Sequence, residues 1–256
     1  MQLQKPSYSP LSHQGGVAYK VVNPLIHHWI ECWNGSEPLL DIGCGNCLNA
    51  STAVDAGARV YATEMARNTV VELQQRYADR SPNLSFHFLQ LPHSVSFPDN
   101  HFSGILCSEV FHFLDHDEVL ESIRQFHRLL TPGGRVILTC ASEELEQMKP
   151  LDMKAIREAQ RQAAPDRMDA LQNAITYFEQ LARMHEPDPK AWEYIELYKA
   201  VFPVTYFNVF NPDQLARAFI DADFNIELIS TGPAPYYALW EHGDQDQIRL
   251  VARKIQ

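Results

Sequence analysis

The fold of this chain is decided at residues 39–47, which read Leu39-Leu40-Asp41-Ile42-Gly43-Cys44-Gly45-Asn46-Cys47. An apolar strand runs into an aspartate, two glycines follow with one residue between them, and a helical pattern begins directly afterwards. Glycines are typical where a ligand lies against bare backbone, because a Cβ atom would collide with it. In an open parallel sheet such a loop lies at the carboxyl end of a strand, where ligands bind, and the next helix N-terminus offers unpaired N–H groups. The stretch predicts a nucleotide-binding loop.

Strands and helices alternate from this loop onward. We expect strands at residues 39–42, 59–63, 84–88, 103–108, 135–140, 224–230 and 248–253, and helices at 46–56, 66–77 and 117–130. A further helix starts at Asn211-Pro212-Asp213-Gln214, because asparagine suits the N-cap and proline the first helical position. The pattern predicts an α/β fold with a Rossmann-like, seven-stranded, mostly parallel sheet and helices on both faces.

Two helical additions are expected around this sheet. Apolar positions at helical spacing in residues 17–33 indicate one or two short helices, within an N-terminal helical lid segment at 1–37. Residues 142–206 form a helical insertion, a substrate lid, within a single domain spanning 1–256. We expect two or three of the apolar side chains of this insertion to reach a ligand, from the set Met148, Met153, Met168, Tyr177, Phe178, Met184, Trp192, Tyr194, Tyr198 and Phe202. A loop at 233–237 could close over the site.

Composition narrows the class of protein. The 256 residues carry a formal charge of −11, which argues against nucleic-acid partners because their affinity comes largely from Lys and Arg. No apolar run reaches the length of a membrane span, and the first residues do not resemble a secretory signal, so we expect a cytoplasmic protein. The cysteine count of five is odd and indicates reduced thiols. The pair Cys44 and Cys47 could be redox-active or bind a metal, but we expect both to line a tight loop and predict no metal site.

The loop does not match a dinucleotide site. A dinucleotide fingerprint has a third glycine for close helix packing, whereas this chain has Leu48 at that position. Asp41 also lies in the wrong place for that fingerprint. An NAD-dependent reductase is therefore disfavoured.

Five segments together resemble the class I S-adenosylmethionine-dependent methyltransferases, and in particular the small-molecule, methyltransferase type 11-like group. They are LLDIGCGNC at 39–47, VYATEM at 60–65, FPDNHFSGILCSEVFHFL at 97–114, LLTPGGRVILT at 129–139 and NPDQLARAFIDADF at 211–224. The resemblance implies an enzyme that transfers the methyl group of S-adenosylmethionine to a small molecule and releases S-adenosylhomocysteine. It implies no nucleic-acid or membrane partner, and it sets neither the acceptor nor the oligomeric state.

The resemblance also implies a set of cofactor-binding residues. Asp41, with the loop residues Gly43, Cys44 and Gly45, would hold the amino-acid end of the cofactor. Glu64 would accept hydrogen bonds from both ribose hydroxyls, which a carboxylate with several lone pairs can do. The remaining cofactor positions are implied beside the adenine, at Met65, Gln90 and Leu91, and under the methionine portion, at Ser108 and Glu109.

For the catalytic residues the pattern leaves alternatives open. His112 lies nearest the expected position of methyl transfer, and it is a general base or a packing residue. Tyr19 is a second possible base.

Three residues depart from the family's pattern. Cys47 stands where glycine is usual, Leu91 lies where an aspartate is expected near the adenine, and Ser103 replaces an aspartate at the start of a strand. These departures motivate an alternative function, a regulatory protein that binds S-adenosylmethionine without turnover.

Overall fold

The computed structural model describes residues 8–11, 16–151, 153–165, 167–168, 170–171, 174–184, 189–201, 207–237 and 242–255. Phe202, expected to belong to the insertion, lies outside the described residues, as do other parts of 1–37 and 142–206. None of the described helices combines the length and apolar character that crossing a bilayer needs.

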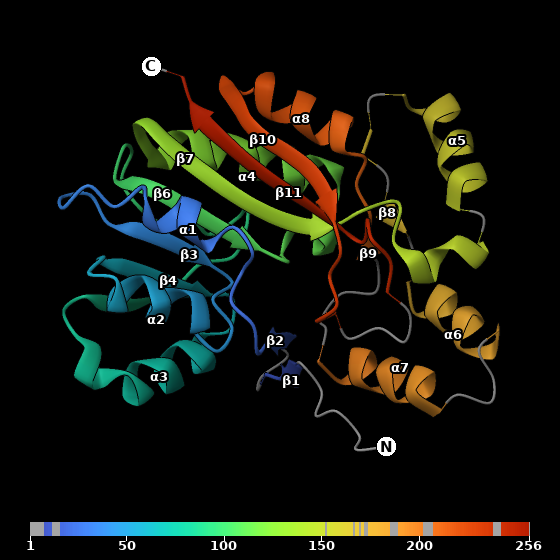
Figure 1. The fold of residues 1–256 in the computed structure, drawn as a ribbon, viewed down its shortest axis with the longest axis horizontal. Helices are drawn as coiled ribbons and strands as arrows, with labels where there is room; N and C mark the ends of the chain where they lie inside the picture. Colours follow the sequence, from blue (N-terminus) through green and yellow to red (C-terminus); the bar gives the residue numbers. More distant parts are fainter. Residues whose placement is uncertain are drawn as a thin grey trace.

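A seven-stranded sheet forms the centre of the fold (Figure 1), with the order β10-β11-β7-β6-β3-β4-β5. The strands are β3 (Leu39–Ile42), β4 (Val60–Glu64), β5 (Leu84–Phe88), β6 (Phe102–Ser108), β7 (Leu130–Ala141), β10 (Phe224–Gly232) and β11 (Gln247–Lys254). Strands β5, β4, β3, β6 and β7 are parallel, and β11 runs antiparallel to both of its neighbours. The predicted seven-stranded, mostly parallel sheet is confirmed. Strand order reverses at β3, so the loop at 43–47 lies at the point where such sheets bind ligands.

Helices cover both faces of the sheet because neighbouring strand residues point in opposite directions. Leu39 packs with α1 (Ile26–Ile30), α2 (Leu48–Asp55) and α3 (Arg67–Arg76) on one face. Leu40 packs with α4 (His116–Leu129) and α8 (Pro212–Ile220) on the other. Short 3-10 helices η1 (Ala78–Arg80) and η2 (Phe111–Phe113) follow α3 and β6. The strands are buried on both sides, which explains their nearly continuous apolar sequence.

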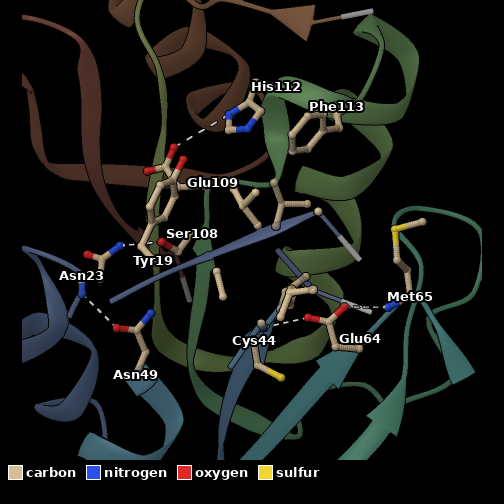
Figure 2. Close-up of a pocket in the computed structure, with 18 of the residues that line it drawn as sticks. Tyr19, Asn23, Cys44, Asn49, Glu64, Met65, Ser108, Glu109, His112 and Phe113 are labelled. Carbon is tan, nitrogen blue, oxygen red and sulfur yellow. Dashed lines mark hydrogen bonds and ion pairs between the residues drawn. The ribbon is translucent and has the colours of Figure 1, made fainter. Parts of the chain in front are cut away.

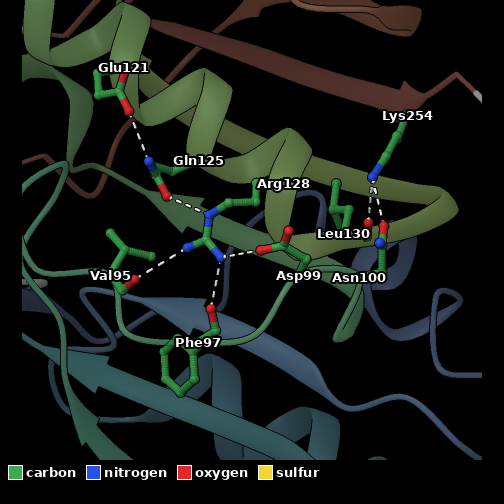
Figure 3. A network of polar contacts seen from close by, with 9 residues as sticks. All are labelled: Val95, Phe97, Asp99, Asn100, Glu121, Gln125, Arg128, Leu130 and Lys254. Atoms are coloured by element: carbon green, nitrogen blue, oxygen red, sulfur yellow. Dashed lines mark hydrogen bonds and ion pairs between the residues drawn. The ribbon is translucent and has the colours of Figure 1, made fainter.

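Helix α4 has strong signals at both ends. Asp115 and Glu118 form a reciprocal capping box at its start. In its last turn, the Arg128 guanidinium donates to the carbonyl oxygens of Phe97 (2.8 Å) and Val95 (3.2 Å) and to Asp99 (2.7 Å), as Figure 3 shows. These bonds tie down the connection that leads from the end of β5 to the start of β6.

The turn at 131–134 was expected to end the helix ahead of a strand at 135. Instead β7 begins at Leu130, and its pairing with β6 shifts register between Phe102 and Gly104. The turn residues at 131–134 therefore lie at an irregularity inside β7 and do not separate it from the helix.

The N-terminal segment contains one short helix of the one or two expected, α1, together with a hairpin that was not expected. Residues 17–19 form β2 (Val17–Tyr19), which pairs antiparallel with β1 (Tyr8–Pro10), and only the five residues of α1 are helical. Gly16, with φ +81°, places its carbonyl where it accepts from the Leu11 N–H at 2.9 Å. Pro24 disfavours a helical conformation at Asn23, so the helix starts beyond it. Where it is described, the segment predicted as a helical lid at 1–37 therefore contains a hairpin as well as a helix.

The insertion after β7 is helical where it is described. It contains η3 (Glu146–Leu151), α5 (Met153–Ala163), α6 (Ala174–Met184) and α7 (Pro189–Val201), which lie to one side of the sheet in Figure 1. A short strand that was not expected, β8 (Ala170–Leu171), pairs with β9 (Phe207–Asn208). The helices have their own core, which includes Phe178, Leu181, Ile195 and Tyr198.

Candidate active site

A cavity of about 260 Å³ opens at the carboxyl edge of the sheet. Its walls come from the loops after β3, β4, β5 and β6, from the β1–β2 hairpin and from the β10–β11 connection. The structure brings all of the predicted site residues to this cavity except Asp41; those lining it are Tyr19, Gly43, Cys44, Gly45, Glu64, Met65, Gln90, Leu91, Ser108, Glu109 and His112. Figure 2 shows several of these side chains converging from different elements.

Both glycines of the loop are required by their surroundings. Gly43 and Gly45 have φ of +66° and +57°, a left-handed conformation that side chains rarely adopt. A Cβ on Gly43 would lie 2.8 Å from Val110 Cγ2, and one on Gly45 would lie 3.2 Å from Ala18 Cβ in the hairpin. The loop therefore packs between Val110, the residue before η2, and the hairpin, and its residues Gly43 and Gly45 line the cavity.

Glu64 ends β4 and faces the glycine loop. Its carboxylate accepts hydrogen bonds from the backbone N–H groups of Gly45 (2.7 Å) and Met65 (3.3 Å). Burial raises the pKa of Glu64 to about 7, and these two hydrogen bonds act in the opposite direction. Each carboxylate oxygen has a further lone-pair site, so Glu64 can also accept from the hydroxyls of a ligand.

Asp41 lies beneath the loop and is only 1 % exposed. Burial and the nearby Glu64 carboxylate raise its pKa to about 8. Its Oδ2 atom is buried without a hydrogen-bond partner among the described residues. The residue expected to hold the amino-acid end of a ligand is thus set behind the loop rather than in the cavity wall.

Cys44 and Cys47 are free thiols whose Sγ atoms lie 3.4 Å apart. Cys47 is fully buried and has φ +64° at the N-cap of α2, which accounts for the glycine usual at this position. Cys44 lines the cavity and Cys47 does not.

The other departures from the family's pattern lie at different distances from the cavity. Leu91 lines it, beside Gln90. Ser103 does not, since its hydroxyl donates to the Glu37 carbonyl at 2.9 Å at the far end of β6.

Asn23 is a buried polar residue that sequence reasoning missed. Its side-chain N–H groups donate to Ser108 Oγ (2.9 Å) and Thr139 Oγ1 (3.0 Å), and its backbone N–H donates to Asn49 Oδ1 (2.9 Å). Both Asn23 and Asn49 line the cavity beside the ends of β6 and α2. Only the asparagine-proline pair marked Asn23 in the sequence, and that pattern signals a turn.

Glu109 and His112 form a buried pair beyond the end of β6. Glu109 has φ +60°, and its carboxylate accepts from Tyr237 Oη and Gln247 Nε2, both at 2.6 Å. Burial raises the pKa of Glu109, while bonds from Tyr237, Thr139 and Gln247 lower it. His112 Nδ1 lies 3.8 Å from Glu109 Oε2 and is buried without a hydrogen-bond partner among the described residues.

The charge state of His112 follows from this burial. Burial lowers its pKa to about 3, so the imidazole is neutral near pH 7 and its contact with Glu109 is not a resting ion pair. The side chain of Glu109, expected under the methionine portion of a cofactor, lines the cavity and links His112 to Tyr237 and Gln247.

Aromatic side chains close the far wall of the cavity. The Tyr19 ring stacks on Tyr237 (centroids 5.8 Å apart) and meets Tyr236 edge-on (5.2 Å), so the predicted loop at 233–237 contacts the hairpin over the site. Phe207 also lines the cavity, although sequence reasoning did not select it. Of the described side chains in the ten-residue apolar set of the insertion, none lines the cavity. Met168 packs into the core beside the sheet, and the others pack into the core of the insertion or are exposed.

Comparison with known proteins agrees with this geometry. Residues 39–134 match the family described as "Methyltransferase domain". This segment of the chain is therefore similar to a methyltransferase domain. The matched range includes the glycine loop, Glu64 and His112. The matched segment therefore supplies much of the wall of the cavity described above.

Curated proteins similar to this chain are distant from it in sequence. A ubiquinone biosynthesis O-methyltransferase of Pseudomonas aeruginosa is 26 % identical over 121 residues, covering 46 % of this chain and 51 % of the relative. The chain thus spans about half the length of that curated protein.

Two solved structures share the whole fold. An S-adenosylmethionine-dependent methyltransferase from Methanosarcina mazei superposes with a TM-score of 0.60 at 17 % identity, covering 91 % of this chain and 98 % of the other. Magnesium protoporphyrin IX methyltransferase from Synechocystis, with bound S-adenosylhomocysteine, gives 0.55 at 16 %, covering 90 % and 80 %. At these identities the likeness is one of fold.

Proposed function

We propose that this protein transfers the methyl group of S-adenosylmethionine to a small-molecule acceptor. The observation that carries the proposal is the position of Glu64, which ends the second strand of the parallel core and faces the loop of Gly43 and Gly45 across one cavity. A carboxylate there can bind a ribose while the loop backbone lies against the rest of the ligand.

The described residues fit this cofactor along its length. Met65 and Leu91 provide apolar surface for the adenine, with Gln90 as a polar neighbour. Asn23 and Ser108 lie at the opposite side, where the amino-acid portion would reach. The Oδ2 atom of Asp41, which lacks a partner among the described residues, adds a buried negative charge behind the loop when Asp41 is ionised.

S-adenosylmethionine supplies a methyl group already activated on its sulfonium sulfur, which passes in line to the acceptor. The protein therefore has to align the two reactants and, where the acceptor is a hydroxyl, to take its proton. His112 is the proposed base because its imidazole lines the cavity, although burial lowers its pKa and so weakens it as a proton acceptor. Glu109, 3.8 Å away, would stabilise the imidazolium that forms. Tyr19 remains the second possible base.

Two segments are proposed as the lid of the site. The β1–β2 hairpin reaches over the cavity and contacts the β10–β11 connection through Tyr19, Tyr236 and Tyr237. The helical insertion at 142–206 would select the acceptor from the side, since Leu145 and Phe207 at its ends line the cavity. Closure of such segments excludes water from the reacting atoms. We propose a cytoplasmic enzyme, because all five cysteines are free thiols.

The proposal is tested with the full-length protein in two stages. Calorimetry should show binding of S-adenosylmethionine and of S-adenosylhomocysteine, and release of S-adenosylhomocysteine should then be followed with a panel of hydroxylated, amino and thiol metabolites. Binding with transfer to a panel member supports the proposal. Binding without transfer to any member would favour the regulatory alternative, and no binding at millimolar cofactor overturns both.

The catalytic assignment is tested by His112→Gln. This variant should keep cofactor binding and lose transfer to a hydroxyl acceptor by about a hundredfold, the typical contribution of a general base. Unchanged transfer would remove His112 from the mechanism.

A further inference from the structure

The part of the cavity nearest His112 is enclosed by aromatic rings. We call it the acceptor chamber, and its walls are His112, Phe113, Phe207, Tyr19, Tyr236 and Tyr237. The His112 ring stacks on Phe207 with centroids 4.7 Å apart and an interplanar angle of 30°. Phe113 meets both rings edge-on, at 4.2 Å from His112 and 6.0 Å from Phe207. Packed ring faces and edges of this kind favour a ligand that is itself flat and aromatic.

The described part of the cavity wall carries acidic side chains and neither lysine nor arginine. The acidic residues are Glu64, Glu109 and Glu118. An acceptor with a carboxylate or phosphate would bury its charge beside Glu109 without a counter-ion. Burial of an uncompensated charge is costly, so the wall disfavours anionic acceptors.

Glu109, the carboxylate beside His112, already has its oxygen atoms engaged and is not free to hold a cationic acceptor. Glu109 Oε2 accepts from Tyr237 and Oε1 accepts from Gln247, both at 2.6 Å. Arg249 lies close enough to lower the pKa of Glu109, and it donates to Gln247 Oε1 at 3.1 Å. The negative charge of Glu109 is therefore compensated by Tyr237, Gln247 and Arg249.

His112 is the group that could take a proton from a hydroxyl acceptor. It is the basic side chain of the chamber's described wall, and its ring lines the cavity beside the predicted path of the methyl group. An imidazole can accept a proton from a hydroxyl group that it reaches by one hydrogen bond, and the Glu109 carboxylate 3.8 Å from Nδ1 would stabilise the imidazolium against the effect of burial.

We propose that the acceptor is an uncharged aromatic molecule that carries a hydroxyl group, bound with its ring against the acceptor chamber. The inference rests on the proposed methyl transfer and names its substrate class. In the reaction the acceptor's O–H bond breaks, its oxygen forms the new bond to the methyl carbon, and the proton passes to His112. The carbon–sulfur bond of the donor breaks with its electron pair going to sulfur, which yields S-adenosylhomocysteine.

The test compares three probes that share one ring and one hydroxyl but differ in charge. These are 2-naphthol, 6-hydroxy-2-naphthoic acid and 6-(aminomethyl)-2-naphthol, titrated at pH 7 into the full-length protein with and without saturating S-adenosylhomocysteine. We expect 2-naphthol to bind most tightly, with the anionic probe weaker by on the order of a hundredfold and the cationic probe weaker by about tenfold.

A charge placed in the chamber should reverse this order. Phe113→Arg is expected to tighten binding of 6-hydroxy-2-naphthoic acid and to weaken binding of 2-naphthol, each by about tenfold, because the guanidinium pairs with the carboxylate. Met184→Arg is the matched control, since its side chain is 52 % exposed on α6 and does not line the cavity. It should leave all three affinities unchanged. If Phe113→Arg does not fold, the comparison of probes on the natural sequence still tests the proposal.

Three outcomes would overturn this assignment. One is equal or tighter binding of either charged probe, and the second is no binding of any probe while S-adenosylhomocysteine binds. The third is an order of affinities among the probes that is the same in Phe113→Arg as in the natural sequence. Failure of the proposed function is separate, because it appears as no binding of S-adenosylhomocysteine itself, and the titrations without that compound then still report on the chamber.

Discussion

Glu64 shows how a binding residue can be held in an environment that disfavours its charge. It is 4 % exposed, and burial raises its pKa to about 7. Without a ligand, two backbone N–H groups are its hydrogen-bond donors among the described residues. The folded protein therefore gives up stability to keep a carboxylate beside the glycine loop, which is common where a site is built for function rather than for stability.

Replacement of Glu64 should separate its contribution to ligand binding from its cost in stability. In Glu64→Gln we expect the affinity for S-adenosylhomocysteine to fall by roughly ten- to a hundredfold, through loss of charge-assisted bonds to the ribose. The ligand-free variant should be more stable at pH 8 by about 1 to 3 kcal/mol, because no buried charge has to be desolvated. Calorimetry and thermal unfolding measure the two effects. Asp79→Asn removes the same formal charge from an exposed position and should change neither.

The backbone conformation of Cys47 leads to a prediction about stability. Its φ of +64° strains any residue that has a Cβ, but its side chain is fully buried against Cys44. Cys47→Gly relieves the strain and Cys47→Ala does not, while both remove the sulfur. We expect the glycine variant to be more stable than the alanine variant by about 1 kcal/mol in denaturant unfolding. An alanine variant equal to or more stable than the glycine variant would show that strain at this N-cap is negligible.

At the scale of elements, the hairpin β1–β2 and the glycine loop depend on each other. The hairpin approaches the loop so closely that a Cβ on Gly45 would lie 3.2 Å from Ala18. The hairpin also carries Tyr19 to the β10–β11 connection. A displacement of the loop should therefore be transmitted to the lid as well as to the cofactor.

The dependence is tested by Gly45→Ala against Gly57→Ala. Both positions have positive φ, +57° and +92°, so both variants should lose about 1 kcal/mol of stability. Only at Gly45 does the new Cβ meet a neighbour, because nothing lies within 4 Å of the one at Gly57. We expect weaker binding of S-adenosylhomocysteine in Gly45→Ala alone. Equal affinities in the two variants would mean that the hairpin contact does not support the site.

For the whole molecule, buried groups set how stability varies with pH. Asp41 and Glu64 have folded pKa values of about 8 and about 7, above their ordinary values of 3.8 and 4.5. The folded state therefore retains protons that the unfolded chain releases, and stability is lost as pH rises toward 8. Burial shifts the pKa of His112 in the opposite direction, so its contribution grows as pH rises to about 6.5 and is then constant.

The free energy of unfolding should accordingly fall between pH 6.5 and pH 8, by about 1 to 3 kcal/mol. Denaturant titrations of the ligand-free protein across this interval measure it. In Asp41→Asn the decline should become shallower, since the group with the higher pKa has been removed. A stability that rises across the interval would contradict the assigned burial of these carboxylates.

Much of the α/β layer could be predicted from local pattern. The bounds of β3 and β5 match the expected residues, and Asn211 caps α8 through its side chain as its sequence context indicated. These elements are specified by apolar runs, caps and turn residues that are close in sequence. The β1–β2 hairpin escaped prediction because strands of three residues show too little periodicity to be told from a helical pattern.

The sequence by itself determined the parallel sheet, the glycine loop and the position of Glu64 at the end of a strand. These features are specified by residues that are close together in the sequence. The tertiary structure alone decided that Asp41 lies behind the loop, that Glu109 turns to Tyr237 and Gln247, and that Asn23 joins Ser108 to Thr139. These contacts link residues up to 138 positions apart. These contacts depend on how the elements pack in three dimensions, and residues so far apart leave no pattern of spacing in the sequence.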